Sequence, residues 1–339
     1  MKILITGGAG YIGSHTIIEI LQKTNWEVIS IDDYSTSSEE TYSRIEEITG
    51  KKINYHKVDI KNYDQLLEIV CQYNDIVGII HFAAHKWVGD SVENPLKYYE
   101  NNLGGLANVL KLQTQCKIAN FIFSSSCSVY GNITELPVTE ESKLNVAESP
   151  YAYTKQVGER IISDYINSQS DKKAISLRYF NPVGAHVSGL NGEIQPKPNN
   201  LLPYITQAAI GKVDSFSVYG DDYPTRDGSC VRDYIHVSDI AEAHVLALKE
   251  LIENNNSLDY DVINLGSGNG VSVFEIIAAF EKENGLKLNY TVGKRRDGDV
   301  ESIYSNSKKA KDILGWEAKY TVKEMVTSAW EWEKKLFEK

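Results

Sequence analysis

The chain has 339 residues, of which 42% are apolar and 24% charged, and both values are typical of a soluble globular protein of about two domains. A formal net charge of −11 disfavours nucleic acids and anionic membranes as partners, so an anionic ligand must be held by local basic groups. The four cysteines, Cys71, Cys116, Cys127 and Cys230, form no C-x-x-C pair, which argues against a zinc site or a disulfide framework and favours the reduced cytoplasm.

The N-terminal stretch predicts a nucleotide-binding unit. Lys2–Thr6 is a short apolar run, and because it begins so close to Met1 we expect neither a signal peptide nor a membrane anchor. Four glycines then form G-x-G-x-x-G and G-x-x-G-x-x-G patterns, and an apolar helical pattern follows at once: Gly7, Gly8, Gly10 and Gly13. Without Cβ atoms such a turn bends sharply, and its N–H groups reach a pyrophosphate at the positive end of the helix.

An acidic residue follows the next predicted strand at the spacing typical of dinucleotide-binding folds. The strand is Trp26–Ile31, and Asp32 comes 19 positions after Gly13. A carboxylate there accepts hydrogen bonds from both ribose hydroxyls and repels a 2′-phosphate, so the sequence favours NAD over NADP. The alternative is that Asp32 and Asp33 merely open a surface turn.

The next elements continue the alternation of strand and helix. We expect a helix around Glu39–Thr49, a strand near 53–58, a helix over Tyr63–Tyr73 with Asn62 as its N-cap, and a strand over Asp75–His81. Such alternation gives a parallel sheet with its ligands at the carboxyl ends of the strands. Asp59 and the segment 82–86 are therefore expected at the same edge as the glycine turn.

Two features of this region allow more than one interpretation. His81 and His85 have the spacing of a metal-binding pair on a helix, but they lie at a strand end, where four residues span roughly 13 Å, so no metal site is expected. The side chain of Lys86 either faces a phosphate or the nicotinamide ribose of the cofactor, or is simply solvated. The predicted helix from Pro95 towards Gln115 contains a Gly104–Gly105 pair, which indicates either close packing on the sheet or a simple kink.

The candidate catalytic groups follow the strand predicted over Ala119–Ser124. Hydroxyls crowd its end, including Ser126, and Ser149–Pro150 is a good helix start that places Tyr151 and Lys155 on one helix face. A tyrosine has a pKa of about 10, but a nearby lysine cation and a nicotinamide cation both favour its phenolate form. Tyr151 is then a base for a hydroxyl proton, with Ser126 hydrogen-bonded to the same oxygen and Lys155 holding the nicotinamide ribose.

These motifs carry a family resemblance. TGGAGYIG, Asp32, FSSSCSVYG and SPYAYTK resemble the extended short-chain dehydrogenase/reductases. HFAAHKWVGDSVENP, YYENNLGG, RYFNPVGAH, NNLLPYI, DGSCVRDYIHV, NLGSG and RRDGD are similar to the UDP-hexose 4-epimerases of that family, which interconvert UDP-galactose and UDP-glucose. The similarity runs from Met1 to at least Trp316.

The resemblance implies two sets of ligand-binding residues. The NAD site is implied at Gly7, Gly10, Tyr11, Ile12, Gly13, Asp32, Asp59, Ile60, Phe82, Ala83, Lys86, Asn101, Ser126, Tyr151, Lys155 and Phe180. The UDP-sugar site is implied at Lys86, Ser126, Tyr151, Asn181, Asn200, Leu201, Ser217, Val218, Tyr219, Arg232, Arg296, Asp299 and Ile303.

The second half of the chain predicts a substrate lobe. After the strand Lys173–Phe180 the βα rhythm loosens, so the expected fold is a doubly wound parallel-sheet Rossmann domain over 1–180 with a smaller α/β lobe over 181–339. Segments 234–251 and 262–266 are expected to return to the main sheet. Arg232 and Arg296 are the local cations that the net charge calls for, since a guanidinium fork matches diphosphate oxygens.

The expected reaction is oxidation at C4 by NAD, rotation of the 4-keto sugar and reduction from its other face. One rival is a nucleotide-sugar dehydratase, but that reaction needs an acidic pair where this chain has Cys127 and Ser128. Another is a non-catalytic NAD-sensing protein.

Trp87 replaces a usually small residue and Ile303 is of intermediate bulk, so N-acetylated sugars are disfavoured. Apolar faces of Pro95–Gln115 and Ser149–Asn167 predict a homodimer.

Overall fold

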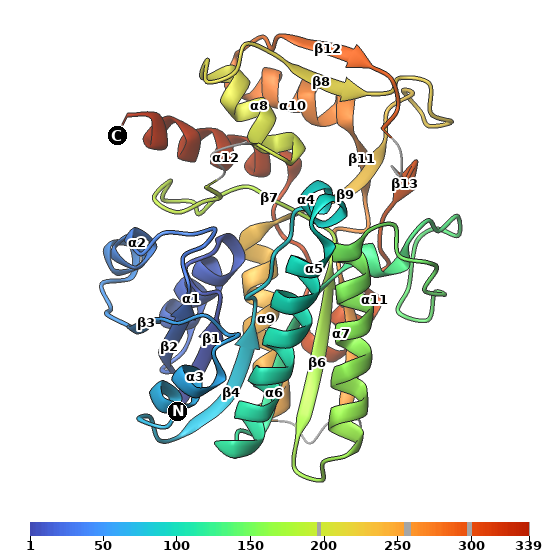
Figure 1. The fold of residues 1–339 in the computed structure, drawn as a ribbon. Helices are drawn as coiled ribbons and strands as arrows, with labels where there is room; N and C mark the ends of the chain where they lie inside the picture. Colours follow the sequence, from blue (N-terminus) through green and yellow to red (C-terminus); the bar gives the residue numbers. More distant parts are fainter. Residues whose placement is uncertain (195–197, 254–258, 297–299, 339) are drawn as a thin grey trace.

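The structure, a computed structural model, describes residues 1–194, 198–253, 259–296 and 300–338. Its larger part is a seven-stranded parallel sheet with helices on both faces. A smaller part, formed mainly by later segments, lies beyond the carboxyl ends of these strands, at the top of Figure 1. None of the helices in the described ranges is long and apolar enough to cross a membrane.

The large sheet reverses its strand order at the position where nucleotides bind in such folds. Its order is β10-β6-β5-β4-β1-β2-β3. The strands are β1 (Lys2–Thr6), β2 (Glu27–Asp32), β3 (Asn54–Lys57), β4 (Ile76–His81), β5 (Asn120–Ser126), β6 (Lys173–Tyr179) and β10 (Tyr260–Leu265). Because the chain moves outward from β1 to β3 and then returns to β4 on the other side of β1, the switch point lies between β1 and β4.

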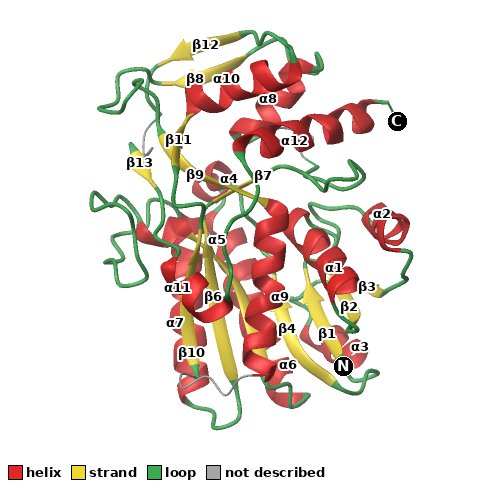
Figure 2. Cartoon of the chain, turned by 180° about the vertical axis from the view of Figure 1, so that it is seen from behind, coloured by secondary structure: helices red, strands yellow, loops and turns green. Residues whose placement is uncertain are grey.

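Helices cover both faces of this sheet, and the strand periodicity divides its core in two. One face carries α1 (Tyr11–Lys23), α2 (Glu40–Thr49), α9 (Val237–Glu253) and α11 (Lys308–Leu314), and the other carries α3 (Tyr63–Val70), α6 (Gly105–Gln115) and α7 (Pro150–Asn167). In β1, Ile3 and Ile5 pack towards α1, whereas Leu4 packs towards α6. Figure 2 shows α9 beside α1 on one face of the strands.

The smaller part has its own sheets and core. Its elements are β7 (Asn181–Val183), α8 (Leu201–Ala209), β8 (Phe216–Tyr219), β9 (Val231–His236), β11 (Gly270–Ser272), α10 (Val273–Asn284), β12 (Tyr290–Gly293), β13 (Ser302–Ile303) and α12 (Val322–Phe337). β9 pairs with β7, β11 and β13, while β8 and β12 form a separate parallel pair. Leu202, Phe216, Phe280 and Val326 are buried together between these sheets and the helices.

The predicted doubly wound α/β fold is confirmed, but two elements differ from expectation. The segment 95–115 is not one α-helix: after α4 (Val88–Glu93) come α5 (Pro95–Tyr98), a π-helical turn η1 (Tyr99–Gly104) and α6. Of the segments expected to return to the main sheet, 234–251 contributes only α9, because β9 is already paired within the smaller sheet. β10 lies beside β6 at the edge of the main sheet.

Candidate active site

The glycine turn follows β1 at the switch point, and its backbone is too close to its neighbours for side chains. Gly7 has a φ of +74°, and a Cβ there would lie 2.6 Å from the backbone nitrogen of Ala83, just after β4. A Cβ on Gly13 would lie 2.3 Å from the carbonyl oxygen of Gly7. Gly10 is the N-cap of α1 and supplies no side-chain cap, so the first N–H groups of that helix are available to an anion. The turn fits a pyrophosphate.

Asp32 lies against this turn and not on the surface. It is the last residue of β2 and is 8% exposed. Its Oδ2 accepts a hydrogen bond from the backbone N–H of Ala9 at 3.0 Å, and its Oδ1 accepts from the Ser37 hydroxyl at 2.7 Å. Burial raises the pKa of the Asp32 carboxyl. The alternative of an exposed surface turn is therefore not supported, because the carboxylate is buried against the glycine turn.

The loop from β3 to α3 is packed against α6. Ile60 is buried, and a Cβ on Gly105 would lie 2.3 Å from its Cδ1, so Gly105 permits close packing. Gly104 has open space around its Cα. The side chain of Asn108 donates hydrogen bonds to the carbonyl oxygens of Ile60 and Lys61 at 3.0 Å each. Gly105 thus permits close packing, but against the loop that contains Ile60 and not against a strand of the sheet.

The π-helical turn η1 presents two buried asparagines. Asn102 fastens the segment after β4: its Oδ1 accepts from the backbone N–H of His85 at 2.8 Å, and its Nδ2 donates to the His85 carbonyl at 3.0 Å. Nδ2 also lies 3.1 Å from the Thr154 hydroxyl on α7. Asn101 is buried and donates to Asn102. Such π-turns are frequent at functional sites, and here the turn is stabilised by contacts to two other segments.

Ser126, Tyr151 and Lys155 converge at the carboxyl end of β5. Ser149 caps α7 by accepting a hydrogen bond from the N–H of Ala152, as predicted, and this fixes the first turns of the helix. The Lys155 ammonium donates to the carbonyl oxygen of Ser124 at 2.6 Å and lies 5.9 Å from the centre of the Tyr151 ring. The sequence predicted these three residues as one group, and the fold brings them together.

Burial controls the ionisation of both titratable groups in this cluster. It lowers the pKa of Lys155 to about 8, and the negative charge of Glu159 opposes that shift. Burial also raises the pKa of the Tyr151 phenol well above 10, while a hydrogen bond with Ser126 opposes the increase. A tyrosine base at this position therefore requires nearby positive charge to favour its phenolate form.

A buried polar network behind this cluster was missed by the sequence analysis. Glu159 lies one turn after Lys155, and its carboxylate accepts from Arg178 of β6 at 2.6 and 2.9 Å. The Ser125 hydroxyl donates to the same carboxylate at 2.5 Å. Arg178 also reaches the Tyr130 hydroxyl at 3.1 Å, which in turn donates to Asn264. Glu159 comes four residues after Lys155, so helical periodicity was one signal available in the sequence.

The Lys86 side chain is 46% exposed, and its ammonium is paired with a carboxylate. Its ammonium forms a 2.5 Å ion pair with Glu193, 107 positions away. It also lies 5.8 Å from the centre of the Tyr11 ring, and Tyr11 donates to the carbonyl oxygen of Gly184 at 2.6 Å. Lys86 and Tyr11 thus connect the nucleotide-binding part to the segment 184–193.

The other predicted cofactor residues lie around the same strand ends. Ile12 follows Tyr11 in the first turn of α1, and Asp59 holds the loop before α3 by accepting from the N–H of Lys61 at 2.8 Å. Phe82 and Ala83 both donate to the carbonyl of Thr6, and Phe180 follows β6 and is buried: these contacts fix the ends of β1, β4 and β6.

His81 has a structural role. Its Nδ1 lies 2.7 Å from the hydroxyl of Thr6, and burial lowers the pKa of the ring to about 3, so the imidazole is neutral. In the described ranges, no group of three or more His, Cys, Asp or Glu side chains is arranged to hold a metal ion.

The predicted substrate residues come from several elements of the smaller part. Asn181 begins β7, Asn200 and Leu201 are the N-cap and first residue of α8, and Ser217, Val218 and Tyr219 lie on β8. Arg296 lies over the ring of Tyr219 at 5.6 Å. Arg232, on β9, lowers the pKa of Cys127 against the larger effect of burial, so its charge acts at the end of β5. Asp299 lies outside the described residues.

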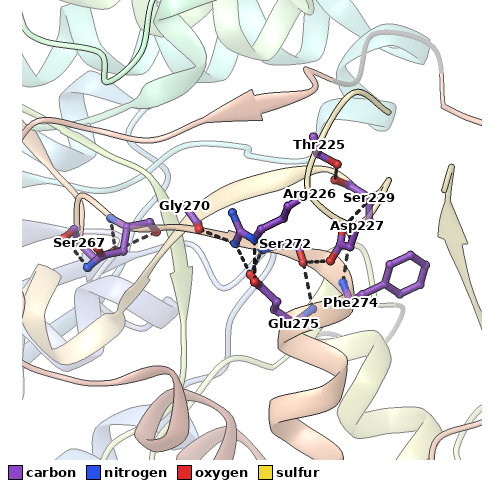
Figure 3. Close-up of polar contacts among 10 residues, drawn as sticks. Thr225, Arg226, Asp227, Ser229, Ser267, Gly270, Ser272, Phe274 and Glu275 are labelled. Carbon is purple, nitrogen blue, oxygen red and sulfur yellow. Dashed lines mark hydrogen bonds and ion pairs between the residues drawn. The ribbon is translucent and has the colours of Figure 1, made fainter. Parts of the chain in front are cut away.

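The loop that precedes Arg232 is anchored to the start of α10 (Figure 3). The Arg226 guanidinium pairs with Glu275 and donates to the carbonyl of Gly270 at 2.8 Å. Asp227 accepts from the hydroxyl of Ser272, the N-cap of α10. Because Ser272 and Glu275 also form a capping box, the loop and the helix start are mutually fixed, and β9 begins from a defined position.

The two residues that bear on the size of the sugar pocket lie in different surroundings. Ile303 is 6% exposed and packs with Val129, Tyr130 and Phe180, next to the end of β5. Trp87 is half-buried and is the N-cap residue of α4. Ile303 therefore contacts the segment that follows Ser126, whereas Trp87 belongs to the start of a neighbouring helix.

Comparison with known proteins identifies close relatives over nearly the whole chain. Residues 4–329 match the family model described as GDP-mannose 4,6 dehydratase. The UDP-glucose 4-epimerase of Bacillus subtilis (strain 168) is 44% identical over 335 residues, which are 98% of this chain and 97% of the relative.

Two solved structures have the same fold. The UDP-glucose-4-epimerase from Stenotrophomonas maltophila, crystallised with bound NAD and formylated UDP-arabinopyranose, aligns with a TM-score of 0.96 at 39% identity and covers 100% of this chain and 99% of its own. The UDP-glucose 4-epimerase from Bifidobacterium longum, in complex with NAD+ and UDP, aligns with a TM-score of 0.93 at 42% identity and covers 99% of this chain and 98% of its own.

Proposed function

The chain belongs to the UDP-glucose 4-epimerases, and on that premise we propose that it interconverts UDP-galactose and UDP-glucose with Tyr151, Lys155 and Ser126 as catalytic residues. Its cofactor is NAD, as in the solved relatives. The observation that carries the assignment is the convergence of a phenol, an ammonium group and a hydroxyl at the carboxyl end of β5, two strands from the glycine turn.

In the proposed reaction Tyr151 takes the proton of the C4 hydroxyl, and Ser126 hydrogen-bonds to the same oxygen. When bound, NAD accepts the hydride of C4 and later returns it. The hydride must return to the opposite face, so the 4-keto sugar turns while its UDP group is held. We assign the binding of UDP to the substrate lobe, which begins near residue 180. Its proposed UDP-binding residues are Asn181, Asn200, Leu201, Ser217, Val218, Tyr219, Arg232, Arg296 and Asp299.

The ionisation of Lys155 supports its role beside Tyr151. With a pKa of about 8, Lys155 is mostly protonated at neutral pH, so a cation lies 5.9 Å from the centre of the phenol ring. Positive charge near a phenol favours the phenolate, whereas burial raises the pKa of Tyr151. Lys155 is also held by the carbonyl of Ser124, which keeps its ammonium at the strand end.

A second candidate is a nucleotide-sugar 4,6-dehydratase, because the matching family model has that description. That reaction also begins by oxidising C4, but it then needs an acid and a base to eliminate water. Here the residues after Ser126 are Cys127 and Ser128. Burial raises the pKa of the Cys127 thiol to about 12, so it supplies neither a thiolate base nor a ready acid at neutral pH. Epimerisation is therefore the favoured outcome.

Incubation of the purified protein with UDP-galactose tests the proposal. UDP-glucose is expected, whereas a stable 4-keto product would indicate a dehydratase, and NAD binding without turnover would indicate an NAD-sensing protein. Tyr151→Phe should abolish turnover while the circular dichroism spectrum is kept. Tyr165→Phe is the matched control, since Tyr165 lies on the same helix and its hydroxyl is hydrogen-bonded to Thr114 at 2.8 Å. Wild-type turnover in Tyr151→Phe would contradict the assignment.

We further propose that the enzyme is a homodimer. Large apolar side chains are exposed along α4, α5 and α7, which contact one another: Val88, Val92, Leu96 and Tyr153. Leu96, at 71% exposure, is the most exposed of them. Sedimentation should give twice the chain mass, and Leu96→Glu should give a monomer. A monomeric wild type would contradict this proposal.

Because all four cysteines are free thiols, we place the enzyme in the cytoplasm.

A further inference from the structure

Two cysteines that the reaction does not use lie side by side on the surface. Cys71 is the C-cap residue of α3 and Cys116 is the C-cap residue of α6, and these helices pack next to each other on one face of the large sheet. Their sulfur atoms are 3.8 Å apart although the residues are 45 positions apart in the chain. Cys71 is exposed and Cys116 is half-buried.

The position of this pair separates it from the active site. Helices that follow parallel strands run back across the sheet, so their C-terminal ends lie at the edge opposite the carboxyl ends of the strands. Cys71 and Cys116 are therefore at the edge remote from Ser126 and Tyr151. A sulfur–sulfur distance of 3.8 Å is longer than the roughly 2.05 Å of a disulfide, and rotation of two cap-position side chains shortens it.

The two thiols differ in reactivity. Burial, together with the neighbouring Cys71 sulfur, raises the pKa of Cys116 to about 12, so Cys116 remains a thiol at neutral pH. Cys71 has the solvent access that a peroxide requires. The other two cysteines lie elsewhere: Cys127 follows β5, and Cys230 is buried directly before β9.

We propose that Cys71 and Cys116 are a site of reversible oxidation that closes into an intramolecular disulfide. The Cys71 thiolate attacks one oxygen of hydrogen peroxide and the O–O bond breaks, which gives a sulfenic acid at Cys71 and a hydroxide; the hydroxide takes up the proton that the Cys71 thiol had released and becomes water. The Cys116 sulfur then attacks the Cys71 sulfur, so the S–S bond forms as the sulfenic S–O bond breaks, and the leaving hydroxyl takes the proton of the Cys116 thiol to become a second water. A dithiol reductant reverses the reaction and regenerates both thiols.

The cross-link acts on stability and not on catalysis. It joins the ends of α3 and α6, whose opposite ends are already connected through Asn108 and the carbonyls of Ile60 and Lys61. Closing a loop of this length restricts the unfolded chain, so the oxidised protein should melt at a higher temperature. Turnover of UDP-galactose should be unchanged, because the two sulfur atoms lie at the edge of the sheet remote from Ser126 and Tyr151.

The test uses the full-length protein treated with increasing hydrogen peroxide under non-denaturing conditions. We expect the loss of two of the four thiols, a decrease in mass equal to two hydrogen atoms, a peptide pair joined at Cys71 and Cys116, and a higher melting temperature that dithiothreitol reverses. Cys71→Ser and Cys116→Ser should lose the cross-link and the shift in melting temperature. Cys230→Ala is the matched control and should keep both.

Several results would overturn the proposal. These are a Cys71 that gains oxygen without losing the Cys116 thiol, a disulfide between two chains, or an equal change of melting temperature in wild type and Cys71→Ser. A cross-link that forms but abolishes turnover would refute the separation from the active site. The thiol count, the mass and the melting temperature are independent of whether the protein epimerises UDP-galactose, because they are read without substrate.

Discussion

Replacing Glu159 by Gln should both destabilise the protein and change the pH dependence of its reaction. Glu159 is 6% exposed, and its carboxylate accepts two hydrogen bonds from Arg178 and one from Ser125. The variant leaves the Arg178 guanidinium buried without a counter-charge. Removal of one partner of a buried ion pair costs about 3–5 kcal/mol, which is a large fraction of a typical unfolding free energy of about 5–15 kcal/mol.

The second effect of this substitution is on Lys155. The charge of Glu159 raises the pKa of Lys155, and burial alone lowers it, so Glu159→Gln should move that pKa below about 8. A lysine whose pKa is lower in the folded than in the unfolded state binds fewer protons when folded. Stability therefore rises with pH between the two values, and the variant should widen this window towards lower pH. The alkaline decrease in kcat, where Lys155 loses its charge, should shift in the same direction.

Urea unfolding and the pH profile of kcat measure these two effects separately. A second variant, Glu159→Gln with Arg178→Met, removes both charges and should recover much of the lost stability, because a buried ion pair is often replaceable by apolar contacts. It should nevertheless keep the shifted pH profile, since Lys155 still lacks its acidic neighbour. The reasoning is refuted if Glu159→Gln unfolds at the wild-type urea concentration and its pH profile coincides with that of the wild type.

Two further predictions concern the cofactor turn and the sugar pocket. Gly13→Ala should lose NAD binding measured by calorimetry, because its Cβ would lie 2.3 Å from the Gly7 carbonyl oxygen. The control Gly89→Ala has open space for a Cβ and should bind NAD normally. Equal binding by both variants would contradict the role of the turn. Ile303→Ala removes bulk beside Tyr130 and should raise kcat/KM for UDP-N-acetylglucosamine relative to UDP-glucose, and an unchanged ratio would exclude Ile303 as a determinant.

Features that depend on neighbouring residues in the chain were predictable. The turn from Gly7 to Gly13 lies within one strand–turn–helix unit, and Ser149 caps the helix that carries Tyr151 and Lys155. In each case hydrogen-bond requirements and backbone freedom act over fewer than ten residues, so the sequence pattern alone identifies the geometry.

Features that depend on distant contacts were not predictable. The π-turn η1 interrupts the expected helix because Asn102 bonds to His85 and Thr154, which come from two other segments. The ion pair between Lys86 and Glu193 joins residues 107 positions apart, so neither residue indicates the other. Segment 234–251 was expected to return to the main sheet, but its first residues belong to β9, which pairs with β7, β11 and β13. Local propensity specifies the element, whereas pairing specifies its place.

The three serines at the end of β5 have different partners because they point to different faces of the strand. Successive strand residues point to opposite faces, so Ser124 and Ser126 share a face and Ser125 takes the other. Accordingly, Ser124 contacts Tyr179 and Ser126 acts on Tyr151, while Ser125 donates to Glu159. Because Glu159 is also one turn after Lys155, strand and helix periodicity together place a carboxylate behind the lysine. Once the strand is known to extend to Ser126, the two-residue period of the strand and the helical period of α7 together predict that Ser125 and Lys155 both lie near Glu159.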